Sequence, residues 1–224
     1  MAAVHRDLRP RGRPRMTKNQ IRHPLEKDNM LRFSMMALAL LGVLAVAGSS
    51  VAAEKADLKV GDQAPKFTSV DDQGKEWNSE SVVGKKVLVV YFYPADMTGG
   101  CTKQACGFRD DMKKLADQGV EVVGVSGDSA ENHQIFKKVY ELNFTLLADE
   151  KGTVADAFGV PTKPGGTITR EVDGKTVEMT RGVTASRWTF VIDKSGKIAA
   201  KDTKVNAAED SKKIMKLVAE LQEK

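Results

Sequence analysis

The chain has 224 residues, of which 41% are hydrophobic, and this composition suits one globular domain of ordinary size together with an extension. The first 53 residues carry nine of the 35 basic and three of the 30 acidic side chains, which leaves 26 basic and 27 acidic side chains in the rest. Net charge therefore excludes nucleic acid and anionic membrane surfaces as expected partners of residues 54–224.

Residues 1–53 are predicted to be a basic N-terminal extension followed by a signal peptide. The apolar run Met35–Ala47 has about thirteen residues, too few to span a bilayer comfortably, and small residues follow it as far as Ala53. We expect cleavage after about Ala53 and export, to the periplasm, without a stable membrane anchor. An uncleaved anchor is the alternative. Residues 1–29 are long for the start of such a signal, which favours a true start at Met30 or Met35.

Residues 54–224 are predicted to form one α/β domain in which strands and helices alternate. Such alternation implies right-handed crossovers and a largely parallel central sheet. In chain order the patterns predict a hairpin of Phe67–Val70 and Lys75–Trp77, a strand at Val87–Tyr93, a helix ending near Gly119, a strand at Val120–Ser126, a helix at Ser129–Asn143, a strand at Phe144–Leu147, a short helix at Thr153–Phe158, a hairpin of Thr167–Val172 and Lys175–Thr180, strands at Trp188–Asp193 and Lys197–Lys201, and a helix at Ala207–Gln222.

The stretch from Val87 to Asp110 is the centre of this arrangement. Val87–Tyr93 is rich in β-branched and aromatic residues and stops at Pro94, as a buried strand does. After a short loop, apolar residues recur at the spacing of one helix face, at Cys101, Ala105, Phe108, Met112 and Leu115. Cys101 is therefore predicted to lie where a strand ends and a helix begins.

That position favours a reactive thiolate at Cys101, because the N-terminus of a helix presents unpaired N–H groups and the positive end of its dipole. The alternative is a small core residue, since free cysteines are often buried. Cys106 shifts the balance. Two residues five apart in a helix have Cα atoms about 8.7 Å apart, beyond the roughly 7 Å that a disulfide tolerates. A pair that closes only when a helical turn unwinds suits a catalytic cycle.

The string Pro94-x-x-x-Thr98-x-x-Cys101, with Cys106 after it, resembles the active-site motif of peroxiredoxins of the bacterioferritin comigratory protein (PrxQ) type. The similarity runs from roughly Gly61 to Leu221. It implies a thioredoxin-like fold with a mixed central β-sheet and helices on both faces. One departure is Gly99, where the family commonly has proline.

The resemblance also implies an activity, that of an atypical 2-Cys, thioredoxin-dependent peroxidase. Cys101 would attack hydrogen peroxide or an organic hydroperoxide and become a sulfenic acid, with water or an alcohol as product. Cys106 would resolve it as an intramolecular disulfide, which thioredoxin or a similar dithiol would reduce. The family also implies a monomer.

Other site residues follow from the same resemblance. Arg187 begins an Arg-Trp-Thr-Phe string where the family has Arg-Ser-Thr-Phe, so Trp188 is a second departure. Its permanent charge would favour the Cys101 thiolate and donate hydrogen bonds to the peroxide oxygens.

Four further residues have smaller expected roles. The Thr98 hydroxyl would accept from the thiol or donate to peroxide, and Pro94 would shield the site and fix the loop. Gln104 and Arg109 also match the family and would orient Arg187 and the helix that carries Cys101.

Two other functions remain open at this point. An exported thioredoxin-type thiol-disulfide oxidoreductase would usually have two residues between its cysteines, whereas here there are four. A non-catalytic exported domain would use a Cys101–Cys106 bridge to constrain a loop, for about 2 kcal/mol. A zinc site is not expected, because His133 is the one histidine of residues 54–224, and no cofactor is predicted.

Overall fold

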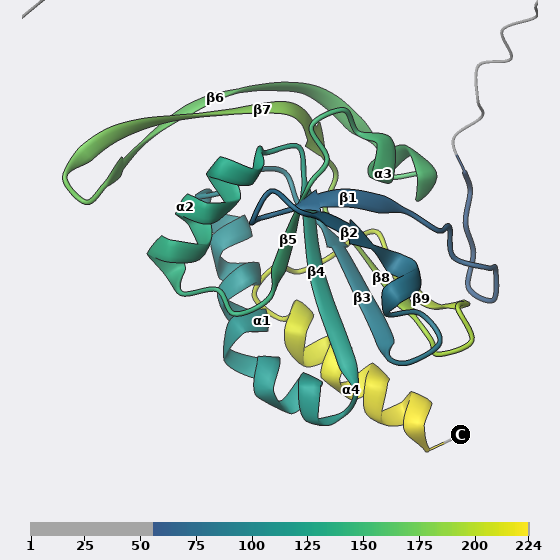
Figure 1. Ribbon diagram of the computed structural model, residues 1–224. Coiled ribbons are helices and arrows are strands. Elements are labelled where there is room, and N and C mark those ends of the chain that lie inside the picture. Colours follow the sequence, from purple (N-terminus) through teal and green to yellow (C-terminus); the bar gives the residue numbers. More distant parts are fainter. Residues whose placement is uncertain (1–55, 224) are drawn as a thin grey trace, which may run out of the picture. The chain divides into compact units, whose positions relative to one another are not determined.

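A seven-stranded β-sheet forms the centre of the computed structural model, which describes residues 56–223 (Figure 1). The strands lie in the order β2-β1-β5-β4-β3-β8-β9. Strands β3, β4 and β5 are parallel and the other pairs are antiparallel, so the predicted mixed sheet is confirmed. The bounds are β1 Thr68–Asp71, β2 Glu76–Asn78, β3 Val87–Phe92, β4 Val120–Ser126, β5 Thr145–Ala148, β8 Trp188–Ile192 and β9 Ile198–Asp202.

Strand β3 is buried along its whole length, and its alternating side chains supply both hydrophobic clusters of the fold. Val89 and Tyr91 belong to the cluster shared with α1, α2 and α4, whereas Val90 and Phe92 belong to the cluster shared with α3. Helices therefore cover both faces of the sheet, as predicted. Their bounds are α1 Gly99–Asp117, α2 Ala130–Tyr140, α3 Thr153–Ala157 and α4 Asp210–Gln222, with a 3₁₀ turn, η1, at Ser79–Ser81.

Two helix boundaries differ from the sequence prediction. Helix α2 begins after Ser129, whose Oγ accepts from the backbone N–H of Asn132 at 3.3 Å. The helix ends at Tyr140, three residues earlier than predicted, because Glu141 takes a left-handed conformation with φ of 52°. Helix α4 begins at Asp210 rather than Ala207. Neither change moves a predicted site residue.

The hairpin of β6 (Thr162–Val172) and β7 (Lys175–Ala185) is much longer than the six-residue strands predicted. Each strand has 11 residues, and β6 runs through Pro164 and Gly165, which precede the predicted start at Thr167. The two strands form a sheet of their own, so β6 is an edge strand, the position in a sheet where proline is tolerated. The turn at Asp173 and Gly174 has positive φ at both residues, as a type I′ turn requires.

The predicted extension and signal peptide at residues 1–53 lie outside the described residues. Within residues 56–223, no helix is both long and apolar enough to cross a membrane.

Candidate functional site

Cys101 lies in the first turn of α1, at the carboxyl end of β3, as the strand-to-helix pattern predicts. The helix begins after Thr98, whose backbone is extended with φ of −101° and ψ of 148°. Only 1% of the Cys101 surface is exposed. The sulfur is therefore close to the free N–H groups of a helix N-terminus and almost sealed from solvent, so that a small oxidant can approach it more readily than a folded protein can.

Arg187 supplies the positive charge at this sulfur. Its Nη2 atom lies 3.1 Å from Cys101 Sγ. The sheet register brings the two together, because β8 pairs with β3 and Trp188 lies opposite Phe92 at the start of the active-site loop. A Cβ atom at Gly100 would lie 3.4 Å from the same Nη2 atom, an ordinary van der Waals distance, so the first turn of α1 lies directly beside the guanidinium. The contact places a permanent positive charge and an N–H donor directly against the Cys101 sulfur.

A buried network holds Arg187 in place. Its Nη1 donates to Gln104 Oε1, and the other end of that amide, Nε2, donates to Asp210 Oδ2 at 2.7 Å. Thr189 Oγ1 donates to the same carboxylate oxygen at 2.8 Å. The expected role of Gln104 beside the arginine thus has direct geometric support. Burial raises the pKa of Asp210, and the hydrogen bonds from Gln104 and Thr189 offset that effect only in part.

Sequence reasoning missed Asp210. It lies 106 residues after Gln104, in the first turn of α4, and nothing in the local pattern of that helix distinguishes it from a solvent-exposed acidic residue. Only its 2% exposure and its two donors identify it as part of the site.

Thr98, Pro94 and Arg109 occupy different places around the site. The Thr98 hydroxyl donates to the Ala95 carbonyl at 2.9 Å, so its proton is already used and its lone pairs remain to accept. Pro94 is half-buried and lies two residues after the end of β3 at Phe92. Arg109 donates to the Tyr140 carbonyl at 2.7 Å, which ties α1 to the end of α2 rather than to the active-site arginine.

Cys106 lies about one and a half turns along α1 from Cys101, and both cysteines are free. Because α1 is continuous from Gly99 to Asp117, helix geometry puts their Cα atoms about 8.7 Å apart. Burial raises the pKa of the Cys106 thiol, and the charge of Arg109 offsets that only in part. The folded helix therefore keeps Cys106 protonated and out of reach.

Beneath the active-site loop lies a buried polar cluster that the sequence did not predict. Asp96 Oδ2 lies 2.7 Å from His133 Nδ1, and Asp96 Oδ1 accepts from the Tyr93 hydroxyl at 2.7 Å. The Asp96 amide donates to Asp128 Oδ2 at 3.0 Å. His133 is fully buried. The cluster anchors the loop to β3, to the end of β4 and to α2.

The charges in this cluster perturb its titration. Burial lowers the pKa of His133, but the Asp96 carboxylate and, less strongly, Asp128 outweigh burial, so the net direction is upward. Burial also raises the pKa of Asp128, and the charge of Asp96 adds to it. Within residues 56–223, no group of three or more histidine, cysteine or acidic side chains could hold a metal ion.

Comparison with known proteins gives a consistent result. A model of the AhpC/TSA family matches residues 60–201. The chain is 46% identical over 136 residues to the chloroplastic peroxiredoxin Q of Sedum lineare, which covers 61% of this chain and 64% of that protein. It is 43% identical over 143 residues to the putative peroxiredoxin bcp of Coxiella burnetii, covering 64% and 87%. The chain therefore spans less than two thirds of the plant relative but most of the bacterial one.

Among solved structures, peroxidoxin BcpB from Mycobacterium tuberculosis superposes with a TM-score of 0.61 at 31% identity, covering 73% of this chain and 98% of that one.

Proposed function

The chain belongs to the AhpC/TSA family, in its peroxiredoxin Q/bcp group, and on that premise we propose that it is a thiol peroxidase that reduces hydrogen peroxide and organic hydroperoxides. The observation that carries the proposal is the 3.1 Å contact between Arg187 Nη2 and the Cys101 sulfur at a helix N-terminus. The positive charge of Arg187 stabilises an attacking thiolate. Because Cys101 is almost fully buried, only a small substrate can reach its sulfur.

In the first step, the Cys101 thiolate attacks one oxygen of ROOH. The sulfur–oxygen bond forms as the O–O bond breaks, the sulfur becomes a sulfenic acid, and the leaving oxygen takes a proton to become ROH. Negative charge grows on the leaving oxygen, and the guanidinium of Arg187 is placed to donate to it. Thr98 lies at the same loop and can accept a hydrogen bond from the incoming peroxide.

In the second step, the Cys106 thiol condenses with the sulfenic acid and water leaves. The first turn of α1 must unwind before the sulfurs can meet. Unwinding also exposes Cys106 to water, which removes the burial that raises its pKa. Thioredoxin or a similar dithiol then reduces the Cys101–Cys106 disulfide by exchange and returns both thiols.

The geometry argues against the other two functions. A thiol-disulfide oxidoreductase must present its first sulfur to a protein disulfide, whereas Cys101 is 1% exposed. A structural Cys101–Cys106 bridge would break the continuous helix that contains both residues.

Export to the periplasm, with cleavage after about Ala53, and a monomeric state complete the proposal. The apolar run Met35–Ala47 supports export, and the family resemblance supports the monomer.

The proposal is tested by Cys101→Ser and Cys106→Ser. We expect Cys101→Ser to abolish peroxide consumption with thioredoxin as donor, because no sulfur remains to attack. Cys106→Ser should still react once at Cys101 but form no intramolecular bridge after one equivalent of peroxide, as mass spectrometry would show. Turnover that survives Cys101→Ser would refute the assignment, and a wild-type product without the bridge would remove the resolving role of Cys106.

A further inference from the structure

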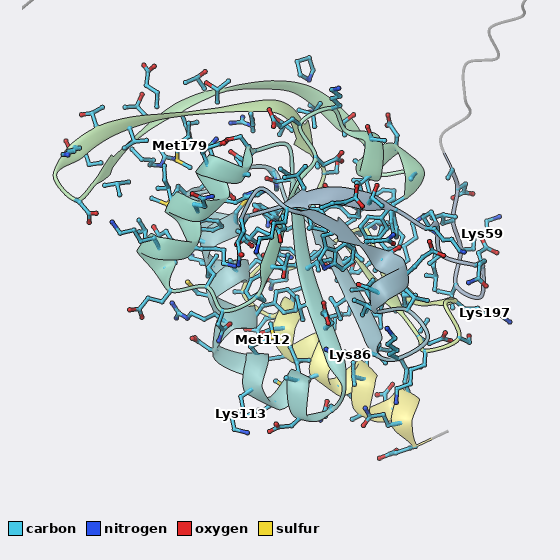
Figure 2. All side chains as sticks on the ribbon, viewed as in Figure 1. Lys59, Lys86, Met112, Lys113, Met179 and Lys197 are labelled. Atoms are coloured by element: carbon cyan, nitrogen blue, oxygen red, sulfur yellow. The ribbon has the colours of Figure 1, made fainter. Side chains whose placement is uncertain are left out.

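The β6–β7 hairpin packs over α2 beside the active site (Figure 1). Asn132 Nδ2 on α2 donates to the Thr180 carbonyl at 2.9 Å, and Lys138 pairs with Asp173 at 2.6 Å. Met179 points from the hairpin toward α2 and is completely buried (Figure 2). These contacts come from β7 and from the turn at the tip, so the hairpin is fixed to the body of the domain.

One side chain of this hairpin reaches the active-site loop. Arg170 Nε, on β6, donates to the backbone carbonyl of Met97 at 2.9 Å. Met97 has φ of 58°, a left-handed conformation that costs a non-glycine residue free energy, and its side chain is 8% exposed in the same cluster as Cys101. Arg170 therefore stabilises a loop conformation that the backbone of Met97 does not favour by itself.

That loop is the part of the chain that must move in the proposed cycle. Met97 precedes Thr98, the N-cap residue of α1, and Cys101 meets Cys106 only after the first turn of α1 has come apart. The hydrogen bond from Arg170 is made in the folded state, to a carbonyl two residues before the first residue of this helix.

We propose that Arg170 is a positioning residue that latches the active-site loop to the β6–β7 hairpin and so sets how fast the sulfenic acid is resolved. This rests on the proposed function. While the latch holds, the Cys101 sulfenic acid remains in the pocket that binds peroxide, where a second ROOH converts it to a sulfinic acid and leaves as ROH. Once the latch opens, Cys106 condenses with the sulfenic acid and releases water. Disulfide formation and oxidation by a second peroxide compete for the sulfenic acid, and Arg170 therefore favours the oxidation to sulfinic acid.

The test compares Arg170→Met with Arg181→Met. Methionine keeps much of the aliphatic stem and removes the donors. Arg181 is the matched control, because its side chain donates to Thr184 and Gly166 within the hairpin and not to the loop. Rapid mixing with peroxide, acid quenching and mass spectrometry give the rate of disulfide formation and the sulfinic fraction at excess peroxide. Amide hydrogen exchange over residues 97–104 of the reduced protein reports loop opening without any oxidation.

For Arg170→Met we expect disulfide formation about fivefold faster, a sulfinic fraction lower by a similar factor and faster exchange over residues 97–104, as the loss of one charged hydrogen bond predicts. Arg181→Met should behave as wild type. The latch would be overturned if Arg170→Met gave the same disulfide rate and sulfinic fraction as wild type. An equal change of these two quantities in Arg170→Met and Arg181→Met would also overturn it. If wild-type Cys101 does not react with peroxide, the proposed function fails, and unchanged exchange in Arg170→Met would then separately dismiss the latch.

Discussion

Arg187 has a long, flexible side chain, and its usefulness to Cys101 depends on neighbours that hold it in one position. Gln104 accepts from its guanidinium, but an amide can present either end. Asp210 removes that ambiguity, because a carboxylate only accepts and must face the NH₂ end of Gln104. The oxygen end is then left to face Arg187. One buried carboxylate on α4 thus orients the charge at the sulfur without touching it.

Two variants of Asp210 should therefore differ in their rate constants for peroxide attack. Asp210→Ala removes the acceptor for Gln104, so Arg187 loses its fixed position and the rate constant for peroxide attack should fall about ten- to a hundredfold. Asp210→Asn keeps one oxygen acceptor and should stay within about threefold of wild type. Stopped-flow measurement of Cys101 oxidation gives both values. Equal losses in the two variants would mean that one amide oxygen does not replace the carboxylate as the acceptor for Gln104.

At the scale of the element, α1 must be stable enough to place Cys101 and weak enough at its first turn to release it. Gly99 contributes to that weakness. It is the first residue of α1, where the family commonly has proline, and a Cβ atom there would meet nothing within 4 Å. Glycine leaves the unwound state with more conformational freedom than proline would, which favours unwinding.

Gly99→Pro is therefore expected to stabilise the domain and slow its cycle. Thr98 is already extended, as a residue before proline prefers, and the first helical position tolerates proline well. The free energy of unfolding should rise by about 0.4–1 kcal/mol, and disulfide formation should slow by about two- to fivefold. Urea unfolding and quenched oxidation measure the two effects. Gly99→Ala, which does not fix φ, is the control. It should change the free energy of unfolding and the rate of disulfide formation less than Gly99→Pro does. Faster disulfide formation in Gly99→Pro would contradict the interpretation.

At the scale of the whole molecule, the active-site loop is clamped between two parts of the fold that are distant in sequence. The Asp96–His133 pair holds its buried side against α2, and Arg170 holds its other end from the hairpin. The groups that face the imidazole are Asp96 on the loop, Tyr93 after β3 and Asp128 after β4. Their charges make the stability of the domain depend on pH.

The sign of that dependence follows from the raised pKa of His133. A histidine that binds its proton more tightly in the folded state stabilises the fold fully below its unfolded pKa of about 6.5. That stabilisation is lost as the pH rises through the higher folded value. The free energy of unfolding of wild type should therefore fall as the pH rises above about 6.5, by at most about 1.4 kcal/mol per pH unit for this one group, and the thermal midpoint should fall with it.

The control for this prediction is His133→Asn, which can still donate to Asp96 but does not titrate. The thermal midpoint of this variant should be lower than that of wild type at acidic pH. It should also change less with pH across the same range, as differential scanning calorimetry would show. The same slope in the variant and in wild type would exclude His133 as its source.

The sequence by itself determined the order of strands and helices, the place of Cys101 at the head of α1 and the need for that helix to unwind before Cys106 can reach it. These features depend on short-range periodicity and on helix geometry, which a local pattern contains. It also indicated Arg187 through the family motif. Only the tertiary structure decided which residues support these groups: Asp210, Asp96, His133 and Arg170 act across separations of 37 to 106 residues. Strand β3 pairs with β8, and the hairpin packs over α2. This packing brings together polar groups that are far apart in the sequence and are not related by any periodic pattern.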